Sequence, residues 1–508
     1  RRFVGRHRLG VTAAAAIFLL TLAFAAAMAV AAYRLDVQSS RLETEARTAR
    51  EVVRFLGGLF EGAEPAVHRG QELTARELLD RGAAIWESSG GQPPGTRAAL
   101  AAAIGKAYLE LSLLPEARRY LEPSLVLRQE VGEASSLAES HRLLARLEWA
   151  ESRYEQAADY AAAATALLEP RREPLAKAES LALEGRSLAS LGRLDEAQEV
   201  LQRSLALLGP DPKSHPALAG VIVRELASLT LYRGQPERAG EQIRQAIELL
   251  EAAHGRLHPE VFEARRLLAA TLDDASAAGD ARPGVRVLEE LLEDQRAFFG
   301  GDHEQIVWTL TDLGSEHIGA ARYPEAVGYY RQAKVMQEAL FDQDHMVLAV
   351  IESGLGQAMW RQGEHEESLP AFRRALEISR QHVDPGSYDL AFPTLYLGEA
   401  LAGTGRCEEA LPLLREAHAS LEKALSSSVF GTFSARWEIA RCEGQLGEAA
   451  DAEARMRSIL AEVEAAGYEK KAEYRLRLAE WRAILEDLDA QRPRPPEAPA
   501  ASAAGSGR

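Results

Sequence analysis

Residues 355–376 read LGQAMWRQGEHEESLPAFRRAL and carry the landmarks on which the fold depends. Gly356 lies in the first half of this stretch, and Gly363 separates it from the second half. In the second half Ser368 precedes Phe372 by four residues, which places both side chains on one face of a helix. The stretch therefore predicts two helices that are joined by a glycine turn and approach closely at their small residues.

The same pattern recurs along the chain with a period of about 42 residues. A small residue followed four positions later by an apolar one occurs at Ala117, Ala157, Ala197, Ala239, Gly284, Ala326, Ser368, Ala410 and Ala452. Another small residue lies twelve positions before most of these, at Gly105, Ala145, Gly185, Ala227, Gly314, Gly356, Gly398 and Ala440. The unit around 262–292 is degenerate. Because one such hairpin cannot bury its apolar face alone, we expect about nine stacked hairpins over 96–465.

These landmarks resemble the tetratricopeptide repeat (TPR). The period exceeds that family's usual length of about 34 residues and is similar to the long repeats of the kinesin-light-chain variety. That variety has a G-x-D-H-P-type entry to each unit, which corresponds here to residues 213–216, 256–259, 301–304 and 343–346. The resemblance implies an all-α fold, a right-handed TPR solenoid whose first helices line a concave surface.

The beginning of the chain predicts a membrane anchor. Residues 1–8 are basic, and residues 9–32 are 24 uncharged residues, enough as a helix to cross a hydrocarbon core of about 30 Å. The positive-inside rule places residue 1 in the cytoplasm and the repeats outside, in a single-pass protein of the inner (plasma) membrane. The alternatives are a cleaved signal peptide that ends near 27–29, or a buried Ala-rich helix.

Residues 1–90 also resemble, more narrowly, a bacterial layout. A basic flank, an Ala-rich span and the charged helix 41–50, followed by EVVRFLGGLFEGAEP, are similar to the segment after the catalytic domain in membrane Ser/Thr protein kinases with C-terminal TPR regions. The chain begins with Arg1 rather than Met. We therefore expect it to be the C-terminal part of a longer chain.

The remaining segments are assigned from composition and pattern. Residues 33–95 read as juxtamembrane and pre-repeat helices, among them a helix over 75–88 with a capping box formed by Thr74 and Glu77. Residues 466–490 read as an amphipathic capping helix, and 491–508 as a disordered Pro/Ala/Ser-rich tail. The apolar residues assigned to the capping helix are Leu476, Leu478, Trp481, Ile484 and Leu485.

Charge and motifs exclude several classes of function. The chain of 508 residues has 59 Lys and Arg against 76 Asp and Glu, a net charge of −17, so a nucleic-acid partner is not expected. No phosphate-binding loop, kinase catalytic set or hydrolase motif occurs, and we predict no enzyme activity in these residues and no cofactor. The recurring histidines 215, 258, 303 and 345 occur once per unit, too far apart to share a metal ion. We read them as helix-entry residues and predict no metal site.

Two cysteines, Cys407 and Cys442, fall in neighbouring units. We expect two separately buried thiols, although an extracytoplasmic location permits a disulfide between them.

Function is then expected on the first helices. In this repeat family, positions 2, 5, 9, 12 and 13 of each repeat face inward. Besides Lys106 and Glu399, those positions hold the partner-binding candidates Arg142, Arg146, Trp149, Arg186, Arg224, Tyr232, Trp308, Trp360, Arg361, Phe392, Trp437 and Arg441. Arg and aromatic residues dominate interface hot spots. Two interpretations stay open: a groove for an extended or acidic peptide or a protein, or Arg that pair with neighbouring Glu and Trp that pack between helices.

Three classes of function follow. The favoured one is an extracytoplasmic sensor region of a receptor kinase that binds a peptide or protein, and the layout permits a homodimer. The second is a free-standing, membrane-tethered scaffold that assembles envelope complexes. The third, an enzyme, lacks any convergent acid–base or nucleophile set. The carboxylate clamp of chaperone-binding relatives is excluded too, because it uses Asn and this chain has none.

Overall fold

The computed structural model describes residues 75–88, 91–272, 282–341, 345–382, 388–424, 430–447, 449–470 and 472–490, together with the single residues Phe24 and Met28. The predicted basic flank, most of the predicted membrane span, Thr74 and the tail 491–508 lie outside these residues, so the expectations for them stay predictions. Among the described helices, none is both long and apolar enough to cross a membrane.

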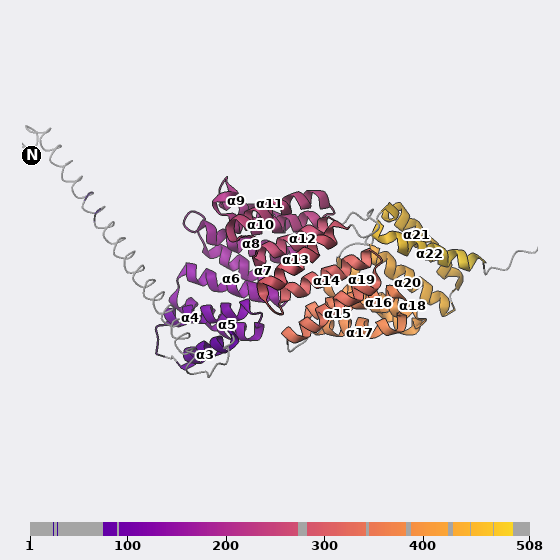
Figure 1. Cartoon of the computed structure of the whole chain (residues 1–508), viewed down its shortest axis with the longest axis horizontal. Coiled ribbons are helices and arrows are strands. Elements are labelled where there is room, and N and C mark those ends of the chain that lie inside the picture. Colours follow the sequence, from indigo (N-terminus) through magenta and orange to yellow (C-terminus); the bar gives the residue numbers. More distant parts are fainter. Residues whose placement is uncertain are drawn as a thin grey trace, which may run out of the picture. The chain divides into compact units, whose positions relative to one another are not determined.

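The helices belong to two compact units, Arg1–Leu207 and Leu208–Arg508, which we call unit 1 and unit 2. In unit 1 the described helices are α3 (Ala75–Ser88), α4 (Pro94–Glu110), α5 (Leu114–Val131), α6 (Ala134–Ala150), α7 (Tyr154–Leu167), α8 (Pro174–Ser190) and α9 (Leu194–Leu207). Helices α4 to α9 form three hairpins of neighbouring helices (Figure 1).

Unit 2 continues the pattern with six hairpins and a final helix within the described residues. Its helices are α10 (Pro216–Tyr232), α11 (Pro236–His254), α12 (Pro259–Thr271), α13 (Pro283–Phe299), α14 (Glu304–Gly319), α15 (Tyr323–Leu340), α16 (Met346–Gln362), α17 (His365–His382), α18 (Tyr388–Gly403), α19 (Cys407–Ala424), α20 (Phe430–Gln445), α21 (Ala449–Ala465) and α22 (Ala472–Ala490). Two 3₁₀ turns, η1 (Pro212–Ser214) and η2 (Tyr468–Lys470), precede α10 and α22. The predicted all-α solenoid of helix hairpins is confirmed.

Wherever the structure describes the turn inside a hairpin, that turn contains a residue with a left-handed backbone. Gly192 and Gly363 adopt φ values of 75° and 97°, which glycine accepts without steric cost. Three hairpins lack glycine there, and Ser112, Ser152 and Ala321 take the same conformation with φ between 57° and 60°. The turn geometry is thus common to these repeats even where the glycine signal is missing.

Small residues of the first helix set the spacing inside each hairpin. A Cβ added to Gly105 would lie 2.7 Å from Cγ of Leu121, and one added to Gly398 would lie 2.9 Å from Cγ of Leu414. Such distances are shorter than van der Waals contact, so the leucine occupies the space that a side chain would need. The recurring small residues therefore mark the points of closest approach between the two helices.

Histidines begin three of the first helices. Nδ1 of His258 accepts a hydrogen bond from the backbone N–H of Glu260 at 3.2 Å, and Nδ1 of His303 accepts one from Gln305 at 3.1 Å. His345 caps α16 in the same way. The helix-entry interpretation is confirmed for these three, whereas His215 precedes α10 without a side-chain cap.

These caps make stability depend on pH. Burial lowers the pKa of His303, and burial together with the stacked His254 lowers the pKa of His258. The unfolded chain, with histidine pKa values near 6.5, then binds more protons than the folded chain. The contributions of the His258 and His303 caps are therefore complete above about pH 6.5 and are lost as the pH falls through the lower, folded-state pKa values.

We expect His303→Ala to lower the free energy of unfolding by about 1 kcal/mol at pH 7.5, because one cap is lost. His303→Asn should keep the cap without a titrating group, and so should lose less stability than the wild type between pH 7.5 and pH 5. Urea unfolding of the three proteins at both pH values measures this. An Asn variant as acid-sensitive as the wild type would contradict the assignment.

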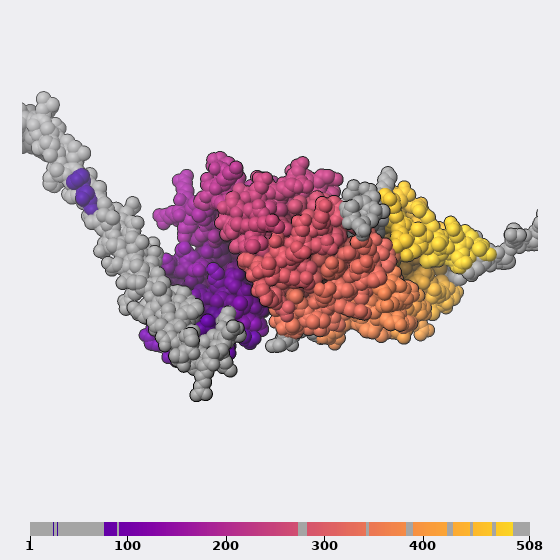
Figure 2. Space-filling model, in the orientation of Figure 1, coloured from indigo at the N-terminus to yellow at the C-terminus, as the bar shows by residue number. Residues whose placement is uncertain are grey.

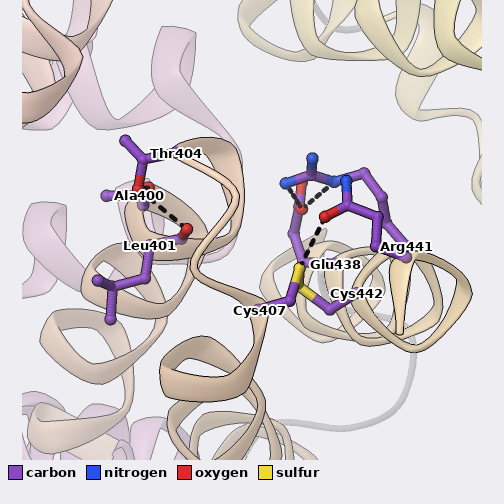
Figure 3. Close-up of a disulfide and its surroundings, with 8 residues drawn as sticks. Ala400, Leu401, Thr404, Cys407, Glu438, Arg441 and Cys442 are labelled. Atoms are coloured by element: carbon purple, nitrogen blue, oxygen red, sulfur yellow. Dashed lines mark hydrogen bonds and ion pairs between the residues drawn. A yellow bond between two sulfur atoms is a disulfide. The ribbon is translucent and has the colours of Figure 1, made fainter. Parts of the chain in front are cut away.

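The cysteines form a disulfide, which corrects the expectation of two separate thiols. Cys407 begins α19 and Cys442 lies near the end of α20, and their Cα atoms are 5.0 Å apart (Figure 3). Both residues are buried. Stacking brings the start of one second helix against the next first helix, so residues 35 positions apart in sequence meet. The bridge thereby joins two successive repeats covalently.

The final helix follows η2 and packs through part of its predicted apolar face. Leu478, Trp481 and Leu485 are buried against α20 and α21. Leu476 is 52% exposed, so its assignment to the buried face was wrong. It lies two positions before Leu478 and five before Trp481, a spacing that places it on another side of the helix.

Candidate functional site

The candidate residues lie on the first helices of the hairpins. These are α4, α6 and α8 in unit 1, and α10, α12, α14, α16, α18 and α20 in unit 2. Within each unit, each first helix also contacts the first helix of the next hairpin. We call the side of these helices that carries the candidate residues the A-helix face.

In unit 1 the A-helix face carries an aromatic–arginine cluster. The guanidinium carbon of Arg186 on α8 lies 3.6 Å from the ring centroid of Trp149 on α6, a cation–π contact. The indole N–H of Trp149 donates a hydrogen bond to Oγ of Ser190 at 3.1 Å. Trp149 and Arg186 both stay partly exposed, and Lys106 on α4 is exposed. This cluster combines the two residue types most often found in interface hot spots.

The other two arginines of this face in unit 1 are paired with acidic residues. Arg146 contacts Glu110 of α4 at 2.9 Å, and Arg142 lies 3.6 Å from Glu179 of α8. The Arg146–Glu110 pair is open to solvent, where such pairs contribute little to stability. A partner's carboxylate could therefore replace Glu110 at small cost.

In unit 2 the pairing is tighter. Arg224 of α10 is buried and contacts Glu225 at 2.9 Å and Glu260 of α12 at 2.5 Å. Burial by itself would lower the pKa of Arg224, but the two carboxylates raise it above its ordinary value. Arg224 thus holds α10 to α12, and its charge is already neutralised within the fold.

A matching pair links the next two first helices. Arg266 of α12 contacts Asp312 of α14 at 2.8 Å, and its guanidinium lies 5.8 Å from the ring centroid of Trp308. Burial raises the pKa of Asp312, which Arg266 opposes. Arg266 is not among the candidates that the sequence pattern predicts, because the unit around 262–292 is degenerate. The signal would have been an Arg three residues before a small residue: Arg266 precedes Ala269 by three positions, as Arg224 precedes Ala227.

Two further aromatic candidates of unit 2 differ in accessibility. Trp360 of α16 packs over Gly403 of α18, where an added Cβ would overlap the indole, and it lies 4.2 Å from the ring of His365. Tyr232, at the end of α10, is 73% exposed. Trp360 therefore fills the space between helices, whereas Tyr232 presents its ring to solvent.

Phe392 of α18 is partly buried. Its ring centroid lies 6.0 Å from that of Tyr396, one turn further along the same helix. On the face that Figure 2 draws, side chains fill the spaces between neighbouring hairpins of unit 2.

The last repeats bury one of the partner-binding candidates and pair two others with acidic residues. Trp437 of α20 is completely buried and stacks on Trp481 of α22, with ring centroids 4.4 Å apart. Arg441 bonds Glu438 on its own helix at 2.7 Å, next to the disulfide (Figure 3). Arg361 of α16 contacts Glu480 of α22 at 3.1 Å. Trp437 is therefore not available to a partner while α22 is in place.

Among the described candidate residues, some are thus paired within the fold and others remain accessible. Five candidate arginines pair with acidic residues: Arg142, Arg146, Arg224, Arg361 and Arg441. Arg186 and Trp149 pair with each other and remain accessible. No group of three or more His, Cys, Asp or Glu side chains in the described part of the chain could hold a metal ion.

Comparison with known proteins agrees with this geometry. A tetratricopeptide-repeat family model matches residues 320–381 and 347–423. No curated protein matches the chain. The comparisons add no support for the likeness between residues 1–90 and membrane kinases. The family match identifies residues 320–423 as tetratricopeptide repeats, and the other described hairpins share their helix–turn–helix form.

Similar solved structures include the nearly identical TPR-like repeats of a Podosopora anserina kinesin light chain, at 20% identity over 42% of this chain and 98% of that one, with a TM-score of 0.33. Another is a Rap protein complexed with competence and sporulation factor, at 13% identity over 77% of this chain and 99% of that one, TM-score 0.46. A third is the apo quorum sensor NprR from B. thuringiensis, at 13% identity over 70% and 97%, TM-score 0.43.

Proposed function

We propose that this chain is the sensor part of a bacterial Ser/Thr receptor-type kinase, anchored by residues 9–32 and binding a peptide or protein on its A-helix face outside the cytoplasm. The kinase domain would precede residue 1 in the parent chain. The observation that carries the binding role is the accessible Trp149–Arg186 cluster on two neighbouring first helices. A TPR fold supports the same role, since its stacked first helices offer an extended binding surface.

The Cys407–Cys442 disulfide supports the proposed location. Disulfides persist in oxidising compartments and are rare in the cytoplasm. A buried bridge between two repeats is therefore expected in a protein whose repeats lie outside the cytoplasm. Protease added to intact spheroplasts should digest the repeats. Full protection of the repeats would contradict this topology.

The cluster is tested by site-specific photo-cross-linking in the native host. A photoreactive phenylalanine analogue at Trp149 should give one discrete cross-linked species, because a partner covers that side chain. The matched control is the same analogue at Val126, which is 55% exposed on the second helix α5 of the same unit.

We expect Arg186→Glu to reduce the cross-linked species at least five-fold. The guanidinium next to Trp149, which can donate two hydrogen bonds to a carboxylate of the partner, is replaced by a carboxylate that repels that group. Equal cross-linking from positions 149 and 126, or no effect of Arg186→Glu, would contradict the assignment of this surface.

A further inference from the structure

The final helix α22 lies on the A-helix face of unit 2. Its Trp481 stacks on Trp437 of α20 with an angle of 4° between the ring planes, and both side chains are almost completely buried. Ring stacking of this kind adds to the free energy gained by burying the apolar surface. Trp481 is thus the apolar anchor of α22 on α20.

Four residues before Trp481, Arg477 supplies a charged anchor. Its Nη2 atom lies 2.8 Å from Oε1 of Glu399 on α18 and 3.7 Å from Oε1 of Glu438 on α20. It also donates a hydrogen bond to Oγ of Ser434 at 3.2 Å. Burial raises the pKa of Glu438, an effect that Arg441 and Arg477 oppose. Without Arg477, the negative charges of Glu399 and Glu438 on adjacent helices would be less completely neutralised.

A third contact extends α22 further along the face. Glu480, adjacent to Trp481, pairs with Arg361 of α16 at 3.1 Å. Helix α22 therefore contacts the first helices of the seventh, eighth and ninth hairpins. A cap for the end of the array would need to cover the ninth hairpin alone.

The contacted residues are those of the predicted partner surface. In the repeat frame, Ser434 and Trp437 occupy positions 2 and 5 of the ninth unit, Glu399 position 9 of the eighth and Arg361 position 13 of the seventh. These are inward positions at which the sequence predicts partner contacts. A segment of the chain itself occupies them.

We propose that α22 is an intramolecular ligand of unit 2, and that the surface beneath it binds an amphipathic helix with an Arg and an aromatic residue four positions apart. The proposal rests on the proposed interaction function and names the partner class for this part of the A-helix face. Arg and Trp at i and i+4 lie on one side of a helix, as Arg477 and Trp481 do. Glu399 and Glu438 take the Arg, and Trp437 takes the aromatic ring.

Because α22 is part of the same chain, an external partner must compete with it for this surface. A covalently linked helix has a high effective concentration at its own site. An external helix must therefore offer the same two anchors. It must also bind unit 2 more tightly when the contacts of α22 with unit 2 are weakened. This is the measurable consequence of the proposal.

The test uses a fluorescein-labelled peptide of residues 472–490 and the full chain, with binding measured by fluorescence anisotropy. The peptide should bind the double variant Arg477→Glu, Trp481→Ala at least ten-fold more tightly than it binds the wild type, because the variant leaves the face open. A peptide with both substitutions should bind neither protein. The matched control chain is Leu476→Ala, on the exposed side of α22, which should behave as the wild type.

A second measurement distinguishes a ligand from a structural cap. A protease site inserted at Gly467, in the turn before η2, allows α22 to be released after folding. The freed segment should stay bound, exchange with excess peptide, and leave the helix content of the remaining repeats unchanged. Unfolding of those repeats on release, or equal peptide affinity for wild type and double variant, would overturn the proposal. Neither measurement involves a natural partner, so either can fail while the cross-link at Trp149 still forms.

Discussion

Replacing Cys407 and Cys442 together by Ala should lower the free energy of unfolding of unit 2 by about 3–4 kcal/mol. The disulfide closes a loop with a sequence separation of 35 that contains α19 and most of α20, and it restricts that loop in the unfolded chain. Because the bridge joins successive repeats, its loss should also let the last hairpins unfold before the rest of the unit. Chemical unfolding followed by circular dichroism measures both effects.

A reductant provides the control for this prediction. Dithiothreitol should bring the wild type to the stability of the double-Ala variant and leave the variant itself unchanged. Reduced and oxidised wild type with the same unfolding curve would show that the bridge does not form in solution.

The second large effect is expected at Gly354, inside α16. Exchanging a helical Gly for Ala ordinarily stabilises a helix by about 0.5–1 kcal/mol. Here we expect Gly354→Ala to lower the free energy of unfolding by about 1–3 kcal/mol, because the added Cβ would overlap the ring of Tyr330. Tyr330 is only 4% exposed and also touches Gly314, so it has no free space into which to move.

Gly328 and Tyr330 supply the matched controls. Gly328 also lies inside a helix, α15, but an added Cβ would meet nothing within 4 Å, so Gly328→Ala should not destabilise the protein. Tyr330→Leu should largely rescue Gly354→Ala, since Leu fills the equivalent position opposite Gly105, Gly185 and Gly398. A double-mutant cycle with no coupling between positions 354 and 330 would contradict this account.

Local spacing was sufficient to predict the hairpins. The small residues at Gly356 and its counterparts report contacts between two helices that follow each other directly in sequence. The histidine caps are equally local, because each bond joins residues two positions apart. Patterns of this range can be read from one sequence, since no other part of the chain decides them.

The candidate surface was predicted less completely. The sequence placed the candidate residues on the first helices, where the structure has them, but it could not say which arginines are already paired. Arg224 and Arg186 both hold inward positions of the repeat frame, yet Arg224 is buried between two carboxylates and Arg186 lies on a tryptophan ring. The difference depends on which side chains the neighbouring hairpin presents.

By itself, the sequence determined the helix hairpins, their period, the glycine turns and the face that carries the arginine and aromatic residues. The tertiary structure alone decided that Cys407 and Cys442 form a bridge, and that α22 covers Trp437 and reaches Arg361. Arg361 and its partner on α22, Glu480, are 119 positions apart in sequence. Periodicity describes neighbours along a helix or within a hairpin, whereas such contacts exist only after the repeats have stacked and brought distant segments within a few ångströms.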